Sequence, residues 1–184
     1  MHQQIQLGQF AQLTIDVPKP LKPMRAKERA VHALSPEVRH CWYSLRGGWV
    51  STNAYLILDW RLLNVSDEAE ALRHTVHYRP GIWRYLEQTQ VADETYPFAR
   101  VELGGTAGIC LQRGIRFSNG VTEFVHKRAD LITLNNEFSI HLYVEVIGLV
   151  GLFDRLLLRG KQYRLVQDEL ERVLSSILRS WIWL

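Results

Sequence analysis

The chain has 184 residues, 47% of them hydrophobic and 22% charged, with a formal net charge of +3 at pH 7. This composition allows one globular domain with a sizeable core and excludes an intrinsically disordered chain. Two cysteines exclude a disulfide-rich scaffold, and the lack of an 18-residue apolar window or a signal-peptide pattern predicts no membrane span and a cytoplasmic setting.

The N-terminal part of the chain predicts a strand followed by an arm. Residues 3–17 end in an alternation of apolar and polar side chains that is typical of a strand. Three prolines within residues 18–23 exclude a helix or a central strand there, so we expect an extended connector. We therefore divide the chain into an N-terminal strand and proline-rich arm, residues 1–23, and one α+β unit, residues 24–184.

Two or three short helices are predicted next. Residues 24–34 are good helix formers, and Ser35-Pro36-Glu37 has the pattern of an N-cap opening a second helix that ends at Gly47-Gly48. Ser66 precedes two glutamates and predicts the N-cap of a third short helix. Between these helices, residues 54–63 predict a strand.

Residues 101–147 predict an antiparallel β-meander. Asn119-Gly120 is a strong hairpin signal, because a type I′ turn needs positive φ at both central residues. Asn135-Asn136 marks a similar turn before residues 137–147, EFSIHLYVEVI. Apolar and polar side chains alternate in that stretch, so one face of the strand must be covered and the other can meet water.

A long amphipathic helix, about residues 152–182, follows the meander. Its apolar residues recur at helical spacing and form one stripe: Val166, Leu170, Val173, Leu174, Ile177, Leu178 and Trp181. We expect this stripe to cover the apolar face of the meander. The predicted fold class is therefore α+β, a single domain in which the meander packs against this helix beside the short N-terminal helices.

This order of elements is similar in plan to the helix-grip folds that hold apolar ligands, although no motif carries the resemblance. The resemblance implies an apolar cavity between the sheet and the C-terminal helix, and binding of a small apolar molecule is our first alternative for the function.

An enzyme is the second alternative. His74 and His77 are three residues apart and could act as general acid and base, with a nearby carboxylate. A metal would need a third ligand from a distant segment, and no phosphate-binding loop, GxSxG elbow or HExxH helix occurs. The sequence therefore predicts no cofactor, no metal and no catalytic residue with a motif behind it.

Interface residues are predicted at both ends of the chain. The C-terminal sequence WIWL is strongly apolar and must pack either on its own core or on a partner, because exposed aromatic side chains favour association. The predicted interface residues are Pro18, Pro20, Leu21, Pro23, Trp181, Ile182, Trp183 and Leu184.

The leading hypothesis is a non-enzymatic structural or assembly protein. It would contact copies of itself or other protein subunits, as in a virion, a tail-like particle or a similar machine. Nucleic acid is a weaker candidate partner, suggested by one basic run: Lys19, Lys22, Arg25, Lys27 and Arg29.

Overall fold

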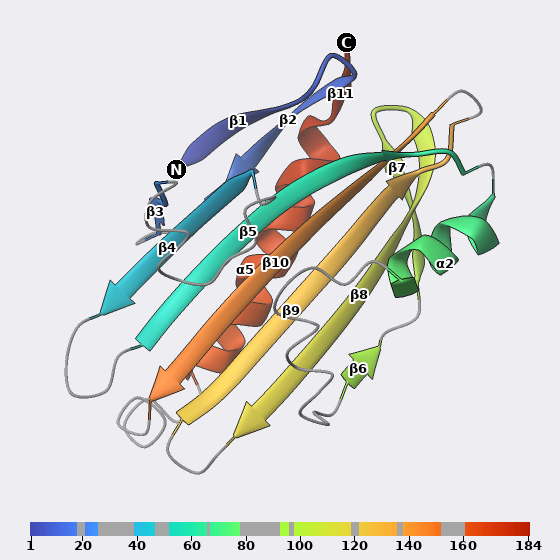
Figure 1. Ribbon diagram of the computed structural model, residues 1–184. Coiled ribbons are helices and arrows are strands. Elements are labelled where there is room, and N and C mark those ends of the chain that lie inside the picture. Colours follow the sequence, from blue (N-terminus) through green and yellow to red (C-terminus); the bar gives the residue numbers. More distant parts are fainter. Residues whose placement is uncertain are drawn as a thin grey trace.

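Strands dominate the protein. The computed structural model describes residues 1–17, 21–25, 39–46, 52–65, 67–77, 93–95, 98–118, 122–135, 138–151 and 161–184. These residues form two antiparallel sheets and two helices (Figure 1).

The larger sheet has eight strands among the described residues. Its order is β3 (Lys22–Pro23), β4 (His40–Arg46), β5 (Thr52–Leu63), β10 (Ser139–Gly151), β9 (Thr122–Thr133), β8 (Thr106–Ser118) and β6 (Asp93–Thr95), while β7 (Ala99–Leu103) also pairs with β8. β5 and β10 are neighbours although the turn-connected meander runs from β8 to β10, so the centre of the sheet joins two distant parts of the chain.

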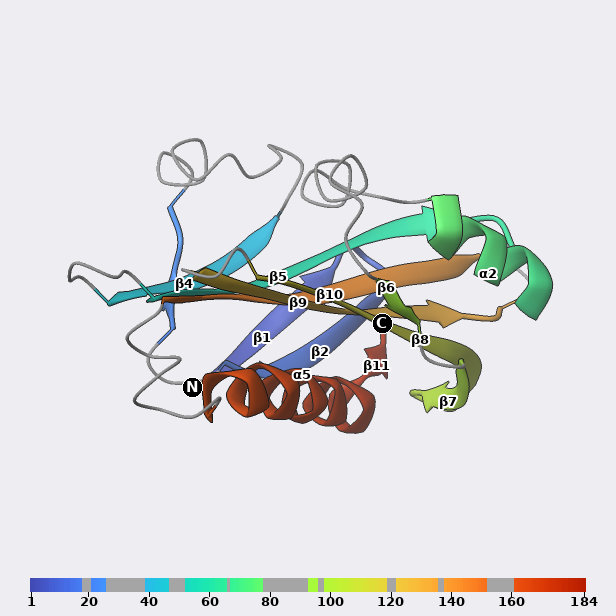
Figure 2. The same cartoon turned by 90° about the horizontal axis from the view of Figure 1, so that it is seen from below.

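The smaller sheet contains both ends of the chain. β1 (His2–Leu7) pairs with β2 (Ala11–Asp16), and β2 pairs in turn with β11 (Ile182–Trp183). The long helix α5 (Lys161–Ser180) lies against one face of the large sheet, and the short helix α2 (Glu68–His77) lies on the opposite face (Figure 2). No helix in the described ranges has the length and apolar character needed to cross a membrane.

The main core lies between the large sheet, α5 and the small sheet. The expected contact of the apolar stripe on the C-terminal helix with the apolar face of residues 137–147 is present in this core. Side chains from four elements pack there with almost no exposed surface: Leu13, Ile15, Leu56, Leu58, Ile140, Leu142, Val144, Val173 and Ile177.

The predicted fold class is wrong. The expected fold was a meander over about residues 101–147 packed against the C-terminal helix, but β3, β4 and β5 extend the sheet on the far side of β10 and a second sheet is present. The polar face of β10 is also buried instead of meeting water: His141, Tyr143 and Glu145 are 0%, 2% and 3% exposed. An isolated meander cannot bury both faces, which is why this strand needs neighbours on both sides and cover on both faces.

One predicted helix also needs correction. The second short helix was expected to run to Gly47-Gly48, but His40–Arg46 is strand β4, paired with β5. Its side chains alternate between faces, with Trp42 in the main core and Cys41 on the other side, so residues 40–46 form a paired strand in place of the expected helix. That capping pattern, most of the predicted helix 24–34 and residues 152–160 of the predicted long helix lie outside the described residues.

Other boundaries differ by a few residues. α2 is the predicted third helix, but Asp67 caps it, since the Glu70 backbone N–H donates to Asp67 Oδ1 at 2.8 Å. At the C-terminus α5 ends at Ser180, and Ile182 belongs to strand β11. β8 and β9 form the predicted hairpin as far as Ser118 opposite Glu123, with the Asn119-Gly120 turn itself outside the described residues.

Helix α5 completes the hydrogen bonding of β2. Ser180 Oγ accepts from the Thr14 N–H at 2.8 Å, and Ser176 Oγ accepts from the Asp16 N–H at 3.1 Å. The two serines are four residues apart and therefore lie on one side of the helix, at a spacing that matches alternate residues of the strand. Helix hydroxyls thus stand in for a neighbouring strand along this edge.

We predict that Ser176→Ala and Ser180→Ala each lower the free energy of unfolding by about 1 kcal/mol, because each leaves a partly buried N–H of β2 without its acceptor. Ser175→Ala is the matched control, since its hydroxyl makes no hydrogen bond within the described part of the chain. Urea unfolding followed by circular dichroism measures the differences. Equal stability of all three variants would contradict this role of the serines.

Candidate functional site

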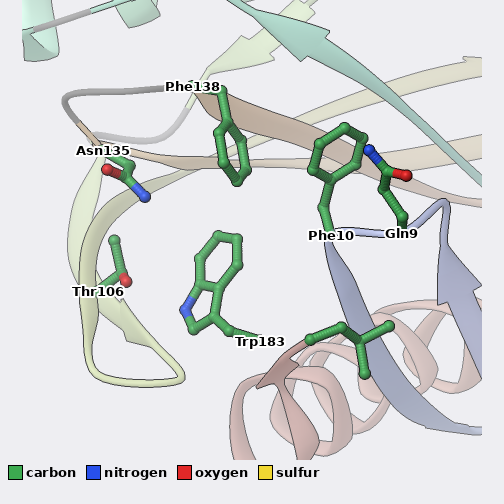
Figure 3. Close-up of a pocket in the computed structure, with 7 residues that line it drawn as sticks. Gln9, Phe10, Thr106, Asn135, Phe138 and Trp183 are labelled. Carbon is green, nitrogen blue, oxygen red and sulfur yellow. The ribbon is translucent and has the colours of Figure 1, made fainter.

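A pocket of about 470 Å³ opens at the end of the molecule where three turns meet the C-terminal tail (Figure 3). The β1–β2 turn, the start of β8, the β9–β10 connection and the tail each contribute to it. The lining residues are Gln9, Phe10, Thr106, Asn135, Phe138, Trp183 and Leu184.

Three aromatic rings form most of the apolar wall of this pocket. The ring centroids of Phe10 and Phe138 are 4.9 Å apart, and those of Phe138 and Trp183 are 6.1 Å apart with the rings at 72°. Figure 3 shows the rings around one side of the space, with Thr106 and Asn135 on the other side. The lining side chains are aromatic, aliphatic, hydroxyl or amide groups, and none of them carries a charge.

The tail that lines the pocket is held by backbone and side-chain hydrogen bonds. The Leu184 N–H donates to the Phe10 carbonyl at 3.0 Å, and Trp183 Nε1–H donates to the Leu103 carbonyl at 3.1 Å. Gly104 has φ +58°, and a Cβ on it would lie 2.8 Å from Trp181 Cδ1. The β7–β8 turn therefore accepts the tail closely because residue 104 lacks a side chain.

The predicted interface residues of the tail have different environments. Trp181 is 5% exposed and belongs to the main core of its own chain, and Trp183 is half-buried in the pocket wall. Ile182 and Leu184 are 56% and 63% exposed, and Leu184 is part of the pocket lining. The tail thus packs on its own chain while its outer side chains stay accessible.

The predicted interface residues of the arm are not brought to this pocket. Leu21 is buried in the main core, and Pro23 is exposed in β3, opposite Trp42. Pro18 and Pro20 lie outside the described residues. A role in an interface stays a prediction for the arm as for the tail.

Sequence reasoning missed five lining residues: Gln9, Phe10, Thr106, Asn135 and Phe138. Asn135 was recognised only as a turn residue and Phe138 only as part of an apolar strand face. Turn signals at the ends of successive strands were the available clue, because hairpin turns at one end of a sheet lie near one another. Which turns converge depends on the strand order.

The opposite face of the large sheet holds a buried charged cluster. Arg128 Nε lies 3.0 Å from both carboxylate oxygens of Asp130, and its Nη1 donates to Glu145 Oε1 at 3.3 Å. Arg113 Nη2 donates to Asp130 Oδ2 at 2.9 Å. Arg128, Asp130 and Glu145 have almost no exposed surface, so each charge depends on these partners for its stability.

His141 extends the cluster toward β5. Its Nε2 lies 2.8 Å from Asp130 Oδ1, and Arg61 Nε donates to its Nδ1 at 3.1 Å, which defines a neutral ring protonated on Nε2. Burial lowers the pKa of His141 below its ordinary value against the opposing attraction of Asp130. Burial disfavours the charge of Asp130, but Arg128 and His141 outweigh burial and hold the pKa of Asp130 well below its usual range.

The same arginines fasten α2 to the sheet. Arg61 Nη2 donates to the His74 carbonyl at 3.2 Å, and Arg113 Nη2 donates to the Thr75 carbonyl at 2.8 Å. Both carbonyls lie in the last turn of α2, where the helix dipole favours cations. Arginines of the charged cluster therefore hold the last turn of α2 against the sheet.

The described residues show little that suits catalysis. His74 is partly buried and its carbonyl accepts from Arg61, while His77 is the last residue of α2 and its side chain is outside what the structure describes. Burial raises the pKa of the Cys110 thiol to about 11, with a further contribution from Asp130, so little thiolate forms at neutral pH. No group of three His, Cys, Asp or Glu side chains in the described ranges could hold a metal ion.

Comparison with known proteins gives a likeness of fold. No model of a protein family matches the sequence, and no curated protein matches it. Among solved structures, the Ran-binding protein Mog1p of Saccharomyces cerevisiae has 13% sequence identity and a TM-score of 0.52, with 99% of this chain and 95% of Mog1p covered. LpqN of Mycobacterium tuberculosis, which is involved in cell envelope biogenesis, has 12% identity and a TM-score of 0.49, with 100% of this chain and 90% of LpqN covered.

We predict that Gly104→Ala is more destabilising than Gly105→Ala. Both residues have positive φ, so both variants carry a similar backbone strain, but a Cβ meets the tail only at position 104 and nothing within 4 Å at position 105. Overpacking against Trp181 should add at least about 1 kcal/mol. Thermal unfolding and tryptophan fluorescence measure the difference, and equal effects would show that the turn does not position the tail.

We predict that stability falls on mild acidification because of His141. A lowered folded-state pKa contributes stability that is present above the unfolded-state pKa of about 6.5 and is lost as the pH falls from there through the folded value. One proton bound more by the unfolded state changes the free energy of unfolding by at most about 1.4 kcal/mol per pH unit.

The slope should be smaller in His141→Gln, whose neutral amide can still bond both neighbours. Urea unfolding between pH 7 and pH 5 gives both slopes. The same slope in His141→Gln and the wild type would assign the effect to another group.

Proposed function

We propose that the protein is a non-enzymatic protein-binding module, and that its pocket receives an uncharged apolar side chain of a partner polypeptide. One observation carries this proposal: Phe10, Phe138 and Trp183 line an open pocket that has no charged lining side chain. Aromatic side chains favour an apolar occupant, because burying an unpaired charge against them would be costly.

The surroundings of the pocket suit a protein partner. Leu184, which lines the pocket, is also exposed, so a polypeptide could place one side chain inside and cover Leu184 with its neighbours. Aromatic pockets that bury such an anchor commonly contribute most of the energy of an interface. The amide group of Gln9 offers a hydrogen bond to the backbone of the same segment.

The likeness to Mog1p adds modest support. Mog1p is described as Ran-binding, so a protein with this fold binds another protein. The fold favours no particular assembly, and a virion or tail-like particle stays a prediction. Nucleic-acid binding also stays a prediction, since Lys19, Lys27 and Arg29 lie outside the described residues.

The two alternative functions have less support. A helix-grip cavity would lie between α5 and the sheet, where the described side chains of Val173 and Ile177 have no exposed surface because core residues surround them. A small apolar molecule would instead find space in the pocket beside Trp183, whose volume lies within the usual range for ligand sites. General acid–base chemistry by His74 and His77 stays a prediction.

We predict that filling the pocket abolishes peptide binding. Thr106→Arg places a long cation in the apolar space, whereas Glu102→Arg adds the same side chain to an exposed position of the same β7–β8 hairpin. Peptides selected from a random displayed library on the wild-type protein should carry an apolar anchor and bind Thr106→Arg at least about tenfold more weakly. Their affinity for Glu102→Arg should match the wild type.

Titration by fluorescence polarisation gives the affinities, and circular dichroism checks that both variants are folded. Peptides that bind Thr106→Arg as well as the wild type would place the binding site elsewhere. A selection that yields only charged anchors, or no binder, would refute the proposed recognition of an apolar side chain.

A further inference from the structure

Strand β1 forms the outer margin of the small sheet (Figure 1). Met1 and Val17 exchange two backbone hydrogen bonds, at 2.9 and 2.8 Å, which sets the alternation along the β1–β2 ladder. In an antiparallel pair every second residue points its N–H and C=O away from the neighbour. On β1 the outward residues are therefore His2, Gln4 and Gln6.

The two edges of this sheet are treated differently. On β2 each outward residue has a partner. Gln12 lies opposite Ile182 of β11, and the N–H groups of Thr14 and Asp16 donate to the two serines of α5. Within the described part of the chain, the outward N–H and C=O groups of β1 have no such partner. His2, Gln4 and Gln6 are exposed, so this edge is accessible.

The sequence of β1 has none of the features that usually protect an edge. Its residues, HQQIQL, include no lysine, acidic residue or proline, and the pairing with β2 is continuous from His2 to Leu7 without a bulge. Natural edge strands commonly use such features to prevent pairing with another chain. An edge of this length without such features is suited to strand addition.

We propose that β1 is a self-association surface, on which β1 of a second copy of this chain adds antiparallel with Gln4 opposite Gln4. Gln4 is the middle one of the three outward residues, so in this register His2 of each copy meets Gln6 of the other and the contact is isologous, as a twofold dimer requires. No Lys, Arg, Asp or Glu side chains then face each other, and the two Gln4 amides can hydrogen-bond each other. About six backbone hydrogen bonds form and join the two small sheets into one.

This proposal concerns a surface separate from the pocket and does not rest on the proposed function. A contact made by one strand from each copy buries little area, so a weak and reversible dimer is expected. Sedimentation velocity between about 1 µM and 1 mM should show a monomer–dimer equilibrium for the wild type.

Charge substitutions at Gln4 test the register. Gln4→Lys and Gln4→Glu each place like charges opposite each other and should weaken the dimer at least about tenfold, whereas an equal mixture of the two variants should restore it. Gln12→Lys adds a charge to the next strand, which β1 separates from the second copy, and should dimerise like the wild type. Circular dichroism confirms that each variant is folded.

Three outcomes would overturn the proposal. A wild-type protein that stays monomeric at 1 mM has no such contact, which includes the case in which the edge serves a strand of another protein. A dimer that both Gln4 variants keep uses a different surface. Failure of the mixed variants to recover excludes the Gln4-to-Gln4 register, and amide exchange at His2, Gln4 and Gln6 that does not slow with concentration would agree with that result.

Discussion

The arrangement depends on one constraint: the central strands of the large sheet are buried on both faces. An apolar face is covered by α5 and the small sheet, which is the ordinary solution for an antiparallel sheet. The other face carries ionisable side chains, and burying them requires that every charge be paired. Arg128, Asp130 and Glu145 satisfy this requirement across two neighbouring strands, β9 and β10. The position of α2 follows, because the arginines that balance the cluster also bond its last carbonyls.

The closing of the chain on itself creates the candidate site. β11 adds to β2 beside the first hairpin, and the tail then lies against the β7–β8 turn at Gly104. The pocket is therefore built from turns and a chain end, while the sheets supply a rigid frame behind them. Such a site combines accessible aromatic side chains with a fixed geometry, which is what a docking surface needs.

Hydrophobic periodicity and turn signals predicted those elements whose structure depends mainly on their own sequence. The helical stripe ending near Trp181, the hairpin of β8 and β9, and the apolar face of residues 137–147 could all be predicted, because their periodicity reflects direct burial. The helix expected to run to Gly47-Gly48 was wrong because His40–Arg46 pairs with β5, and pairing partners are not visible in local sequence. Of the pocket, only the tail residues Trp183 and Leu184 could be singled out, since their composition alone marks them as apolar surface.

The sequence by itself determined that this chain forms a packed domain with a long C-terminal amphipathic helix, an antiparallel hairpin sheet and an aromatic tail, because composition and period act through local geometry. Only the tertiary structure decided that β5 lies beside β10, that His141 and Glu145 are buried, and that Phe10 and Phe138 meet Trp183. Each of these depends on contacts between residues far apart in the chain. Such contacts are selected by the packing of the whole core, and no short stretch of sequence encodes them.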